Sequence, residues 1–394
     1  MQLNEMLKVA TEKKASDLHL KVGVAPVLRI DGRLTAIQDM GRLAREWMTD
    51  TLFGIMTPHQ KEQYTKVHDL DLAYSVPGLG RFRVNIYQQR GTVGAVFRVI
   101  PMKILTVREL NLPEVVENLA MEPRGLILVT GTTGSGKSTT LAGMVDHINN
   151  NRNSHIITIE DPIEYLHRDR MSLMNQREVG FDTTTFATAL RHALRQDPDV
   201  VMVGEMRDHE TISTALVAAE TGHLVLSTLH TSDATETINR IISVFPPHQQ
   251  QQIRLQLATV LEGIISMRLV PRADGRGRIP AVEVLVATTI IRECIVDKER
   301  AKEIHEIIFE GRSQYGMQTF DQSLMDLYEK ELITYEEAIK QCTNPEDFAL
   351  KVRGIESIDD LTWEKEKLSA PVSRRRGTGK DSGGFEVDRF TRKK

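Results

Sequence analysis

The feature that most constrains this chain is a glycine-rich segment at residues 131–139, with the sequence GTTGSGKST. It matches the pattern G-x-x-x-x-G-K-S, follows the apolar run 126–129 and precedes residues 137–149, whose apolar positions recur with helical periodicity. A strand, a glycine loop and a helix in that order direct backbone N–H groups and the positive end of the helix toward phosphate. The segment therefore predicts a nucleoside triphosphate site after a buried strand.

We expect all nine residues of this segment to contact the nucleotide, with ATP as the nucleotide and Mg²⁺ as its metal ion. The glycines allow close approach of the backbone, Lys137 reaches the β and γ phosphates, and the Ser138 hydroxyl is a ligand for Mg²⁺. The nine residues are Gly131, Thr132, Thr133, Gly134, Ser135, Gly136, Lys137, Ser138 and Thr139.

The glycine-rich segment belongs to the larger of two predicted domains, residues 114–368, in which apolar strands alternate with helices. Such strands are typical of a parallel sheet that is covered on both faces, so the predicted fold class is α/β. The predicted strands are 126–129, 156–159, 200–203 and 224–226. The predicted helices are 137–149, 184–195, 210–220 and 249–265, followed after residue 287 by a helical carboxy-terminal part with clear segments at 318–329 and 335–341.

The first hundred residues follow a different pattern, which predicts a small α+β domain. A helix at 4–13 precedes several segments with period-two alternation, and a Pro-Gly-Leu-Gly turn separates two of them. The predicted strands are 17–21, 26–30, 71–76, 81–88 and 92–100. Residues 101–113 begin and end with proline, which favours an interdomain linker.

Composition excludes several classes of protein. The 394 residues carry a formal net charge of −4, and an acidic body does not suit a nucleic-acid groove, so we expect no nucleic-acid partner. Two cysteines are too few for a four-cysteine zinc module. No apolar run reaches the ~20 residues that cross a bilayer, so we expect a cytoplasmic protein. Residues 369–394 are predicted to be a disordered basic tail, which either contacts an anionic membrane leaflet or only aids solubility.

Hydrolysis requires a group that polarises water at the γ-phosphate, and Glu205 is the predicted one. It follows the strand 200–203, and a carboxylate at the carboxyl end of such a strand faces the ligand crevice. The strand 156–159 leads into Glu160, Asp161 and Glu164, which we expect to hold Mg²⁺ through water and to orient the attacking water. Solvated or helix-capping carboxylates are the alternative.

Two histidines, His223 and His230, flank the predicted strand 224–226. At the ends of a strand beside the catalytic strands, they are candidates to sense the γ-phosphate, with ordinary hydrogen bonding as the alternative. Neither has the H-E-x-x-H spacing of a zinc site, so we expect no zinc.

Phosphoryl transfer also needs positive charge on the transferred group, which an arginine from another domain or subunit often supplies. Arg81 and Arg83 lie two apart in a predicted strand and so share one face. Arg81, Arg83 and Arg98 are the candidates from the first domain, and Arg195, Arg207 and Arg240 are those from the second. For each of them, an ordinary surface ion pair is the alternative.

Together these motifs resemble the PilT family of type IV pilus retraction ATPases, within the secretion ATPase superfamily, over residues 4–356. Residues 16–20 resemble the amino-terminal signature of the family, and 131–139 its Walker A motif. Three further segments resemble motifs of the family: 159–165 its Asp box, 200–207 its atypical Walker B motif and 221–231 its His box. The sequence GMQT at 316–319, followed by Leu324 and Leu327, is similar to a carboxy-terminal motif of the retraction branch.

The resemblance implies a PAS-like first domain, a RecA-like ATPase domain and a ring of six subunits. It implies that Glu205 is the catalytic glutamate, that Glu160 and Glu164 are the Asp-box acids, and that His223 and His230 are the His-box pair. The three arginines of the first domain would close over the nucleotide. The ring would act on a PilC-like platform protein of the inner membrane, which removes pilin subunits from the base of the fibre.

Two departures from the family pattern accompany this resemblance. Two cysteines exclude the zinc-bearing extension and secretion branch, and Val296 stands where the retraction family has the second arginine of its AIRNLIRE segment. Two alternative functions stay open beside a primary retraction motor. One is a PilU-like accessory ATPase that works through a paralogous retraction ATPase, and the other is a nucleotide-gated binding module on the pilus platform.

Overall fold

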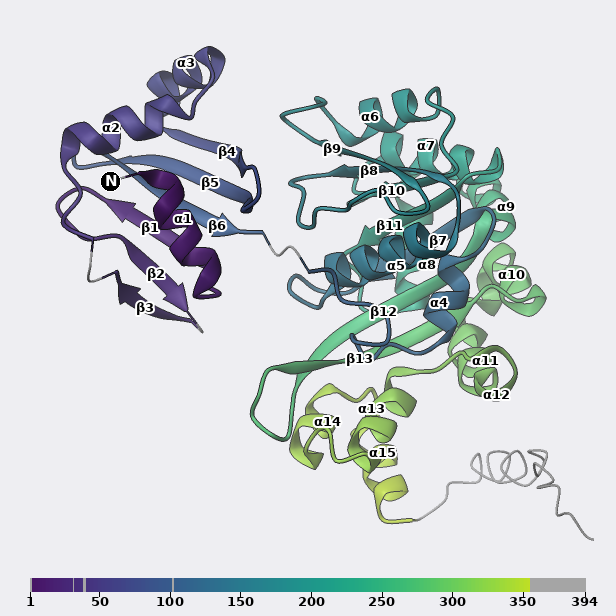
Figure 1. Cartoon of the computed structure of the whole chain (residues 1–394). Coiled ribbons are helices and arrows are strands. Elements are labelled where there is room, and N and C mark those ends of the chain that lie inside the picture. Colours follow the sequence, from purple (N-terminus) through teal and green to yellow (C-terminus); the bar gives the residue numbers. More distant parts are fainter. Residues whose placement is uncertain (1, 31, 38–39, 101–102, 355–394) are drawn as a thin grey trace, which may run out of the picture. The chain divides into compact units, whose positions relative to one another are not determined.

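A computed structural model describes residues 2–30, 32–37, 40–100 and 103–354, and two β-sheets organise them (Figure 1). The chain forms one compact unit as far as Pro345, and the described part of the second unit is the helix α15 (Pro345–Val352). The predicted tail at 369–394 lies outside the described residues. Among the residues that are described, no helix is both long enough and apolar enough to cross a membrane.

The first sheet is antiparallel and has its apolar core on one face. Its strand order is β3-β2-β1-β6-β5-β4. Alternate residues such as Leu18 and Leu20, or Val84 and Ile86, are fully buried and pack with helices α1 and α2 in one cluster. The elements are α1 (Leu3–Glu12), β1 (Asp17–Lys21), β2 (Val27–Ile30), β3 (Arg33–Ala36), α2 (Arg45–Gly54), α3 (Pro58–Val67), β4 (Asp69–Val76), β5 (Gly80–Gln89) and β6 (Thr92–Val99).

The second sheet has the order β13-β12-β7-β11-β10-β8-β9; β13 runs antiparallel to β12, and the other pairs are parallel. Helices connect most of its parallel strands, as is usual for a parallel sheet, whereas β8 and β9 are joined by a loop without a helix. The elements are α4 (Val115–Ala120), β7 (Gly125–Thr130), α5 (Lys137–Asn151), β8 (His155–Glu160), β9 (Leu173–Glu178), α6 (Phe186–Ala193), β10 (Val200–Val203), α7 (His209–Glu220), β11 (Leu224–Leu229), α8 (Ala234–Ser243), α9 (Gln250–Val260), β12 (Leu261–Pro271) and β13 (Arg278–Val286).

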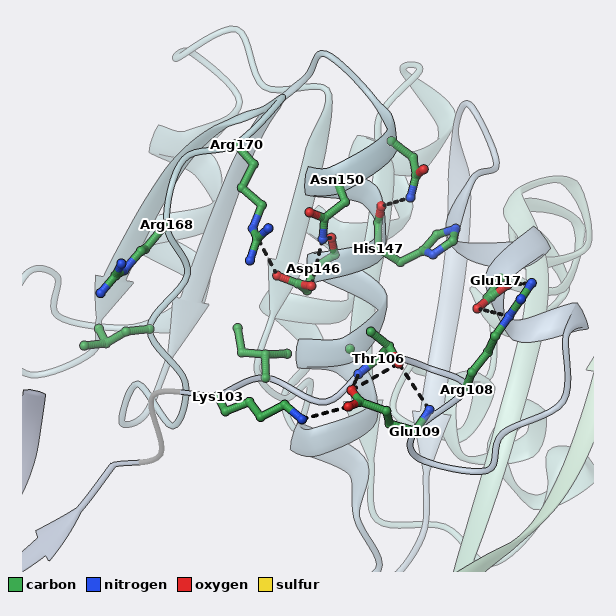
Figure 2. Close-up of a pocket in the computed structure, with 14 residues that line it drawn as sticks. Lys103, Thr106, Arg108, Glu109, Glu117, Asp146, His147, Asn150, Arg168 and Arg170 are labelled. Atoms are coloured by element: carbon green, nitrogen blue, oxygen red, sulfur yellow. Dashed lines mark hydrogen bonds and ion pairs between the residues drawn. The ribbon is translucent and has the colours of Figure 1, made fainter. Parts of the chain in front are cut away.

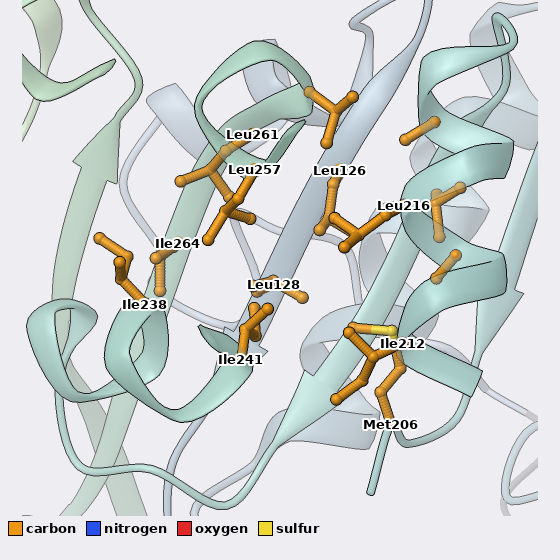
Figure 3. Close-up of a cluster of buried hydrophobic side chains, with 14 of the residues drawn as sticks. Leu126, Leu128, Met206, Ile212, Leu216, Ile238, Ile241, Leu257, Leu261 and Ile264 are labelled. Atoms are coloured by element: carbon orange, nitrogen blue, oxygen red, sulfur yellow. The ribbon is translucent and has the colours of Figure 1, made fainter. Parts of the chain in front are cut away.

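Helices cover both faces of this sheet. Leu126 and Leu128 of β7 pack with helices α6 to α9, whereas Ile127 and Val129 pack with α4 and α5. Figure 3 shows the first of these layers, in which side chains of α7, α8 and α9 surround Leu126 and Leu128. Burial on both faces explains why the central strands are continuous apolar runs, since each buried aliphatic side chain contributes about 1.5–3 kcal/mol.

The carboxy-terminal part is helical, as the sequence predicts. Thr319 and Gln322 form a reciprocal capping box at the start of α13, and Ser323 Oγ accepts a 3.1 Å hydrogen bond from the Val282 N–H of β13. The elements are α10 (Thr289–Val296), the 3₁₀ helix η1 (Lys298–Glu303), α11 (Ile304–Glu310), α12 (Arg312–Tyr315), α13 (Phe320–Glu329) and α14 (Tyr335–Gln341). The predicted α/β fold with a helical carboxy-terminal part is therefore confirmed.

The predicted helix at 249–265 is wrong in its last turn and a half. Helix α9 ends at Val260, and Leu261 begins the strand β12, which is buried between β7 and β13. A short apolar run fits a buried strand as well as a helix, so periodicity did not separate the two. Gly263 fits this tight place, because a Cβ there would lie 2.8 Å from the side chain of Leu119. The strands β3, β9, β12 and β13 and the helices α2, α3, α4 and α8 were not predicted.

Candidate nucleotide site

The candidate site lies at the edge of the second sheet where β7, β11, β10 and β8 end. Because these neighbouring strands are parallel, their carboxyl ends meet at one edge, which in open α/β sheets is where ligands bind. The edge encloses a cavity of about 280 Å³. Of the residues predicted for the site, those that line this cavity are Thr133, Gly134, Lys137, Ser138, Glu160, Asp161, Glu164, Glu205, Arg207 and His230.

The glycine loop has a backbone that a larger residue could not adopt at Gly131. Its φ is +142°, and a Cβ there would lie 2.5 Å from Ser135 Oγ and 2.6 Å from Met267 O. Gly136, at φ +103°, precedes α5, and no side chain caps this helix. The first N–H groups of α5 therefore lack partners within the helix, and a phosphate is the ligand that such an end favours.

Lys137 is buried, at 8% exposure, and forms no ion pair among the described residues. Its Nζ donates to Gly131 O at 2.8 Å and to Thr132 O at 3.0 Å. Burial lowers the pKa of Lys137, while the carboxylates of Glu205 and Glu164 act in the opposite direction. A buried amino group held by neutral carbonyls fits an anionic ligand such as the phosphates of a nucleotide.

Glu160 is the buried acid of the site. Its Oε1 accepts hydrogen bonds from Thr158 Oγ1 at 2.6 Å and from Gln176 Nε2 at 3.0 Å, and its Oε2 accepts the N–H of Glu164 at 3.3 Å. Burial raises the pKa of Glu160, and these hydrogen bonds lower it in part. Asp161 also lines the cavity but is exposed, so the three acids after β8 differ in their surroundings.

Glu205 pairs with Arg207 through one oxygen, and His230 lies near the same oxygen. Its Oε2 lies 2.7 Å from Nη2 of Arg207 and 3.7 Å from Nε2 of His230. Burial lowers the pKa of His230, and the nearby charges of Lys137 and Arg207 lower it further, while Glu205 raises it in part; the net shift favours the neutral imidazole. The ends of β10 and β11 are fixed to each other, because Thr228 Oγ1 donates to Gly204 O at 2.6 Å.

The two predicted histidines are not brought together. His223 precedes β11, where its ring Nδ1 lies 2.9 Å from Ala218 O, whereas His230 follows the same strand. Seven residues of extended chain separate the two backbone positions by about 20 Å. Within one chain, His230 lines the cavity and His223 does not.

The three arginines predicted from the first domain do not line the cavity either. Arg81 Nη2 pairs with Glu178 Oε2 at 2.7 Å, Arg98 Nε pairs with Asp17 Oδ1 at 3.0 Å, and Arg83 is exposed on β5. Arg207 is the candidate from the second domain that does line it, whereas Arg195 and Arg240 do not.

Sequence reasoning missed the residues that support these acids. Tyr165 lines the cavity, and its hydroxyl lies 2.9 Å from Thr139 Oγ1 of helix α5. Thr158 stands two residues before Glu160, so period-two alternation in a strand was a usable signal for it. Gln176 is far away in the sequence, on an edge strand that was not predicted, and no signal pointed to it.

A larger cavity, of about 790 Å³, lies beside the carboxyl end of α5 and residues 103–109. Figure 2 shows that Lys103, Arg108 and Arg170 point toward acidic side chains. Lys103 pairs with Glu109 at 2.7 Å, and Arg108 pairs with Glu117 at 3.2 Å. None of the residues predicted for the site lines this cavity, and its paired charges give a phosphate little to bind.

Comparison with known proteins matches residues 95–347 to the family described as type II/IV secretion system protein. The chain is 44% identical over 348 residues to the type IV pilus retraction ATPase PilT of Pseudomonas aeruginosa, which spans 88% of this chain and the whole of that protein. It is 41% identical over 377 residues to the type IV pilus ATPase PilU of the same organism, which spans 95% of this chain and 97% of that protein.

A solved structure is similar over the same extent. The crystal structure of the pilus retraction motor PilT with bound ADP superposes with a TM-score of 0.81, at 46% identity, over 88% of this chain and 98% of that chain. A protein of this fold thus binds an adenine nucleotide.

Proposed function

Because this chain belongs to the family of type II/IV secretion system proteins and is an ATPase of that family, we propose that it hydrolyses ATP to drive the retraction of type IV pili. The observation that carries this proposal is the convergence of Lys137, Glu160 and Glu205 on one cavity, from the start of α5 and the ends of β8 and β10. Similarity to PilT over 88% of the chain supports retraction as the work that this ATPase does.

The phosphate loop binds the nucleotide. Backbone N–H groups at the start of α5 and the amino group of Lys137 contact the phosphates, and loss of Lys137 removes a charge-assisted contact. Ser138 and Glu160 are the residues that would hold Mg²⁺, which neutralises charge on the phosphates when it is bound.

Glu205 orients the attacking water and takes its proton. Arg207 pairs with Oε2, His230 lies near it, and Oε1 has no hydrogen bond among the described residues, so Oε1 is the atom that accepts the proton. His230 stays neutral beside it and is positioned to respond to the γ-phosphate. Glu164, which also lines the cavity, helps to orient the water, and His223 contacts a neighbouring subunit or serves the fold.

The motor works as a ring of six copies, with ATP and Mg²⁺ in each site. In this proposal the arginines of the first domain, Arg81, Arg83 and Arg98, close over a nucleotide as residues 1–100 and 114–368 move about the linker 101–113. The ring acts at the cytoplasmic side of the inner membrane, on a PilC-like platform protein. Domain closure on binding and release after hydrolysis supply the movement.

A second candidate function is that of a PilU-like accessory retraction ATPase. The specific observation in its favour is that the similarity to PilU spans 95% of this chain, against 88% for PilT. Such a protein would have the same nucleotide site and would act through a paralogous ring.

The experiment that tests the ATPase is steady-state ATP hydrolysis by the purified chain and by Glu205→Gln, with the mass of each sample from light scattering. A hexamer whose hydrolysis disappears in the variant supports the proposal, and a hexamer without turnover contradicts it. Retraction is then measured in a strain that lacks its own PilT and PilU. Twitching restored by this chain alone supports a primary motor, whereas restoration only together with a PilT supports the accessory function.

A further inference from the structure

Gln176 lies on β9, the edge strand of the second sheet, and all the polar groups of its side chain are engaged. Its Oε1 accepts the backbone N–H of His167 at 2.8 Å. Its Nε2 donates to Tyr165 O at 2.9 Å and to Glu160 Oε1 at 3.0 Å. A single amide thus joins the edge strand to the loop after Glu160 and to the buried carboxylate itself.

The strand pairing explains why Gln176 reaches Glu160. β8 and β9 are parallel, and Thr158 is the register partner of Gln176. Thr158 Oγ1 and Gln176 Nε2 both donate to the same oxygen, Oε1 of Glu160, from neighbouring strands. Two donors fix the plane of the carboxylate, and its Oε2 has only the longer 3.3 Å bond from the N–H of Glu164.

The same amide acts on the phosphate loop from a distance. The Tyr165 carbonyl is held by Gln176, and the Tyr165 hydroxyl lies 2.9 Å from Thr139 Oγ1 in the first turn of α5. Thr139 follows Ser138 and Lys137 directly in that turn. Tyr165 therefore connects the support of Glu160 with the helix that carries the phosphate-binding groups.

We propose that Gln176 is a positioning residue for the nucleotide site, which acts through Glu160 and Tyr165 and does not touch the nucleotide. Gln176 is absent from the lining of the cavity, whereas Glu160 and Tyr165 both line it. This inference rests on the proposed function, because Glu160 must serve the bound nucleotide for its orientation to matter. Partners that orient a metal-binding carboxylate typically change metal affinity or activity by about 10- to 100-fold when they are removed.

The test compares Gln176→Leu with Asn175→Leu. Asn175 is the preceding residue on the same strand, is exposed, and contacts His155 Nε2 at 2.7 Å, at the opposite end of β8 from Glu160. Both variants replace an amide by the same apolar side chain. Glu160→Gln is the reference for full loss of the carboxylate. Thr158→Val removes the second donor to Glu160 with little change of shape, so it tests the same inference if Gln176→Leu does not fold.

Two readouts are measured on the full chain, namely kcat and KM for ATP, and the calorimetric affinity for ADP with and without Mg²⁺. We expect Gln176→Leu and Thr158→Val to lower kcat by about 10- to 100-fold with KM changed by less than about threefold. ADP affinity without Mg²⁺ stays at the wild-type value, and the gain in affinity on adding Mg²⁺ is lost, as in Glu160→Gln. Asn175→Leu behaves as the wild type.

The outcomes separate this inference from the proposed function. If wild-type protein hydrolyses ATP and both Gln176→Leu and Thr158→Val keep the wild-type kcat and Mg²⁺ gain, the inference is overturned and the ATPase stands. If Gln176→Leu loses ADP affinity equally with and without Mg²⁺, Gln176 only supports the fold, which also overturns it. If wild-type protein shows no turnover, the Mg²⁺ gain in ADP affinity still decides the role of Gln176.

Discussion

His230 Nε2 lies 3.7 Å from Oε2 of Glu205, the same oxygen that pairs with Arg207 at 2.7 Å. One oxygen of the carboxylate therefore pairs with Arg207 and lies close to the ring of His230. A neutral histidine and an arginine can share that oxygen without mutual repulsion, which a doubly charged pair could not do.

We predict that Glu205→Gln keeps nucleotide binding and loses hydrolysis. The amide retains the shape and the contact with Arg207 but cannot accept a proton from water, so kcat should fall by at least about 100-fold. ADP affinity measured by calorimetry should stay within about threefold of the wild type. Rapid turnover by this variant would show that another group activates the water.

Lys137→Ala is predicted to abolish nucleotide binding. The change removes a buried amino group that serves the phosphates in the ground state, where charge-assisted contacts contribute about 1.5–3 kcal/mol each. The expected result is an ADP dissociation constant raised at least about 10- to 100-fold, together with an unchanged melting temperature in nucleotide-free buffer. Equal binding by Lys137→Ala and Glu205→Gln would refute the role of Lys137.

The first domain is predicted to contribute Arg83 to turnover. Arg83 is exposed on β5, so Arg83→Ala should leave the free energy of unfolding unchanged while it slows hydrolysis by at least about tenfold. Arg33→Ala is a matched control, because Arg33 is an exposed arginine on β3 of the same sheet. If both variants have wild-type kinetics, the arginine role moves to the second domain, where Arg207 lines the cavity.

His167 should lower the free energy of unfolding at acid pH. Burial lowers the pKa of His167 to about 4, so the unfolded chain binds a proton below its ordinary value of about 6.5 while the folded chain does not. Stability is therefore lost as pH falls through 6.5 toward 4, by about 2 kcal/mol between pH 7 and 5. Urea unfolding of the wild type and of His167→Gln at both pH values measures the free energy of unfolding. An equal change between pH 7 and 5 in the two proteins would contradict the prediction.

Glu283 should have the opposite effect on the alkaline side. Burial raises the pKa of this carboxyl to about 7, although the Ala234 N–H donates to it at 2.8 Å. Here the folded chain keeps a proton that the unfolded chain loses above about 4.5, so stability falls as pH rises from 4.5 to 7. Glu283→Gln keeps an acceptor for the Ala234 N–H but does not titrate. Between pH 5 and 8 its free energy of unfolding should therefore fall by about 2–3 kcal/mol less than that of the wild type. Equal slopes for both proteins would disprove the effect.

The sequence indicated residues that line the cavity better than it indicated the residues that support them, for physical reasons. Glu205 and His230 follow apolar strands, and the rule that parallel strands present their carboxyl ends at one edge places them beside Lys137. Gln176 escaped prediction because the strand LMNQRE has few apolar residues and lies at the sheet edge. The helix predicted through residue 265 failed because β12 is buried on both faces and so has no period of its own.

Contacts between distant segments also escaped prediction. The pair of Arg81 and Glu178 joins residues that are 97 positions apart, and nothing in either local pattern indicates it. Such pairs depend on how whole elements pack, whereas motifs depend on a few adjacent residues. The predicted roles of the three arginines likewise depend on packing, because in the proposed function they act within an assembled ring. The phosphate loop, in contrast, is a continuous segment of one chain.

The central position of β11 has a consequence for the evolution of this enzyme. Its residues are in register with β7 on one side and with β10 on the other, so that Leu229 pairs with Thr130 and Ser227 with Val203. A slip of one residue would displace His230 by about 3.3 Å and turn every aliphatic side chain of the strand to the wrong layer. The packing inside the sheet thus sets the position of His230 relative to the other residues of the candidate site. Selection for activity and selection for folding therefore act on the same leucines and valines.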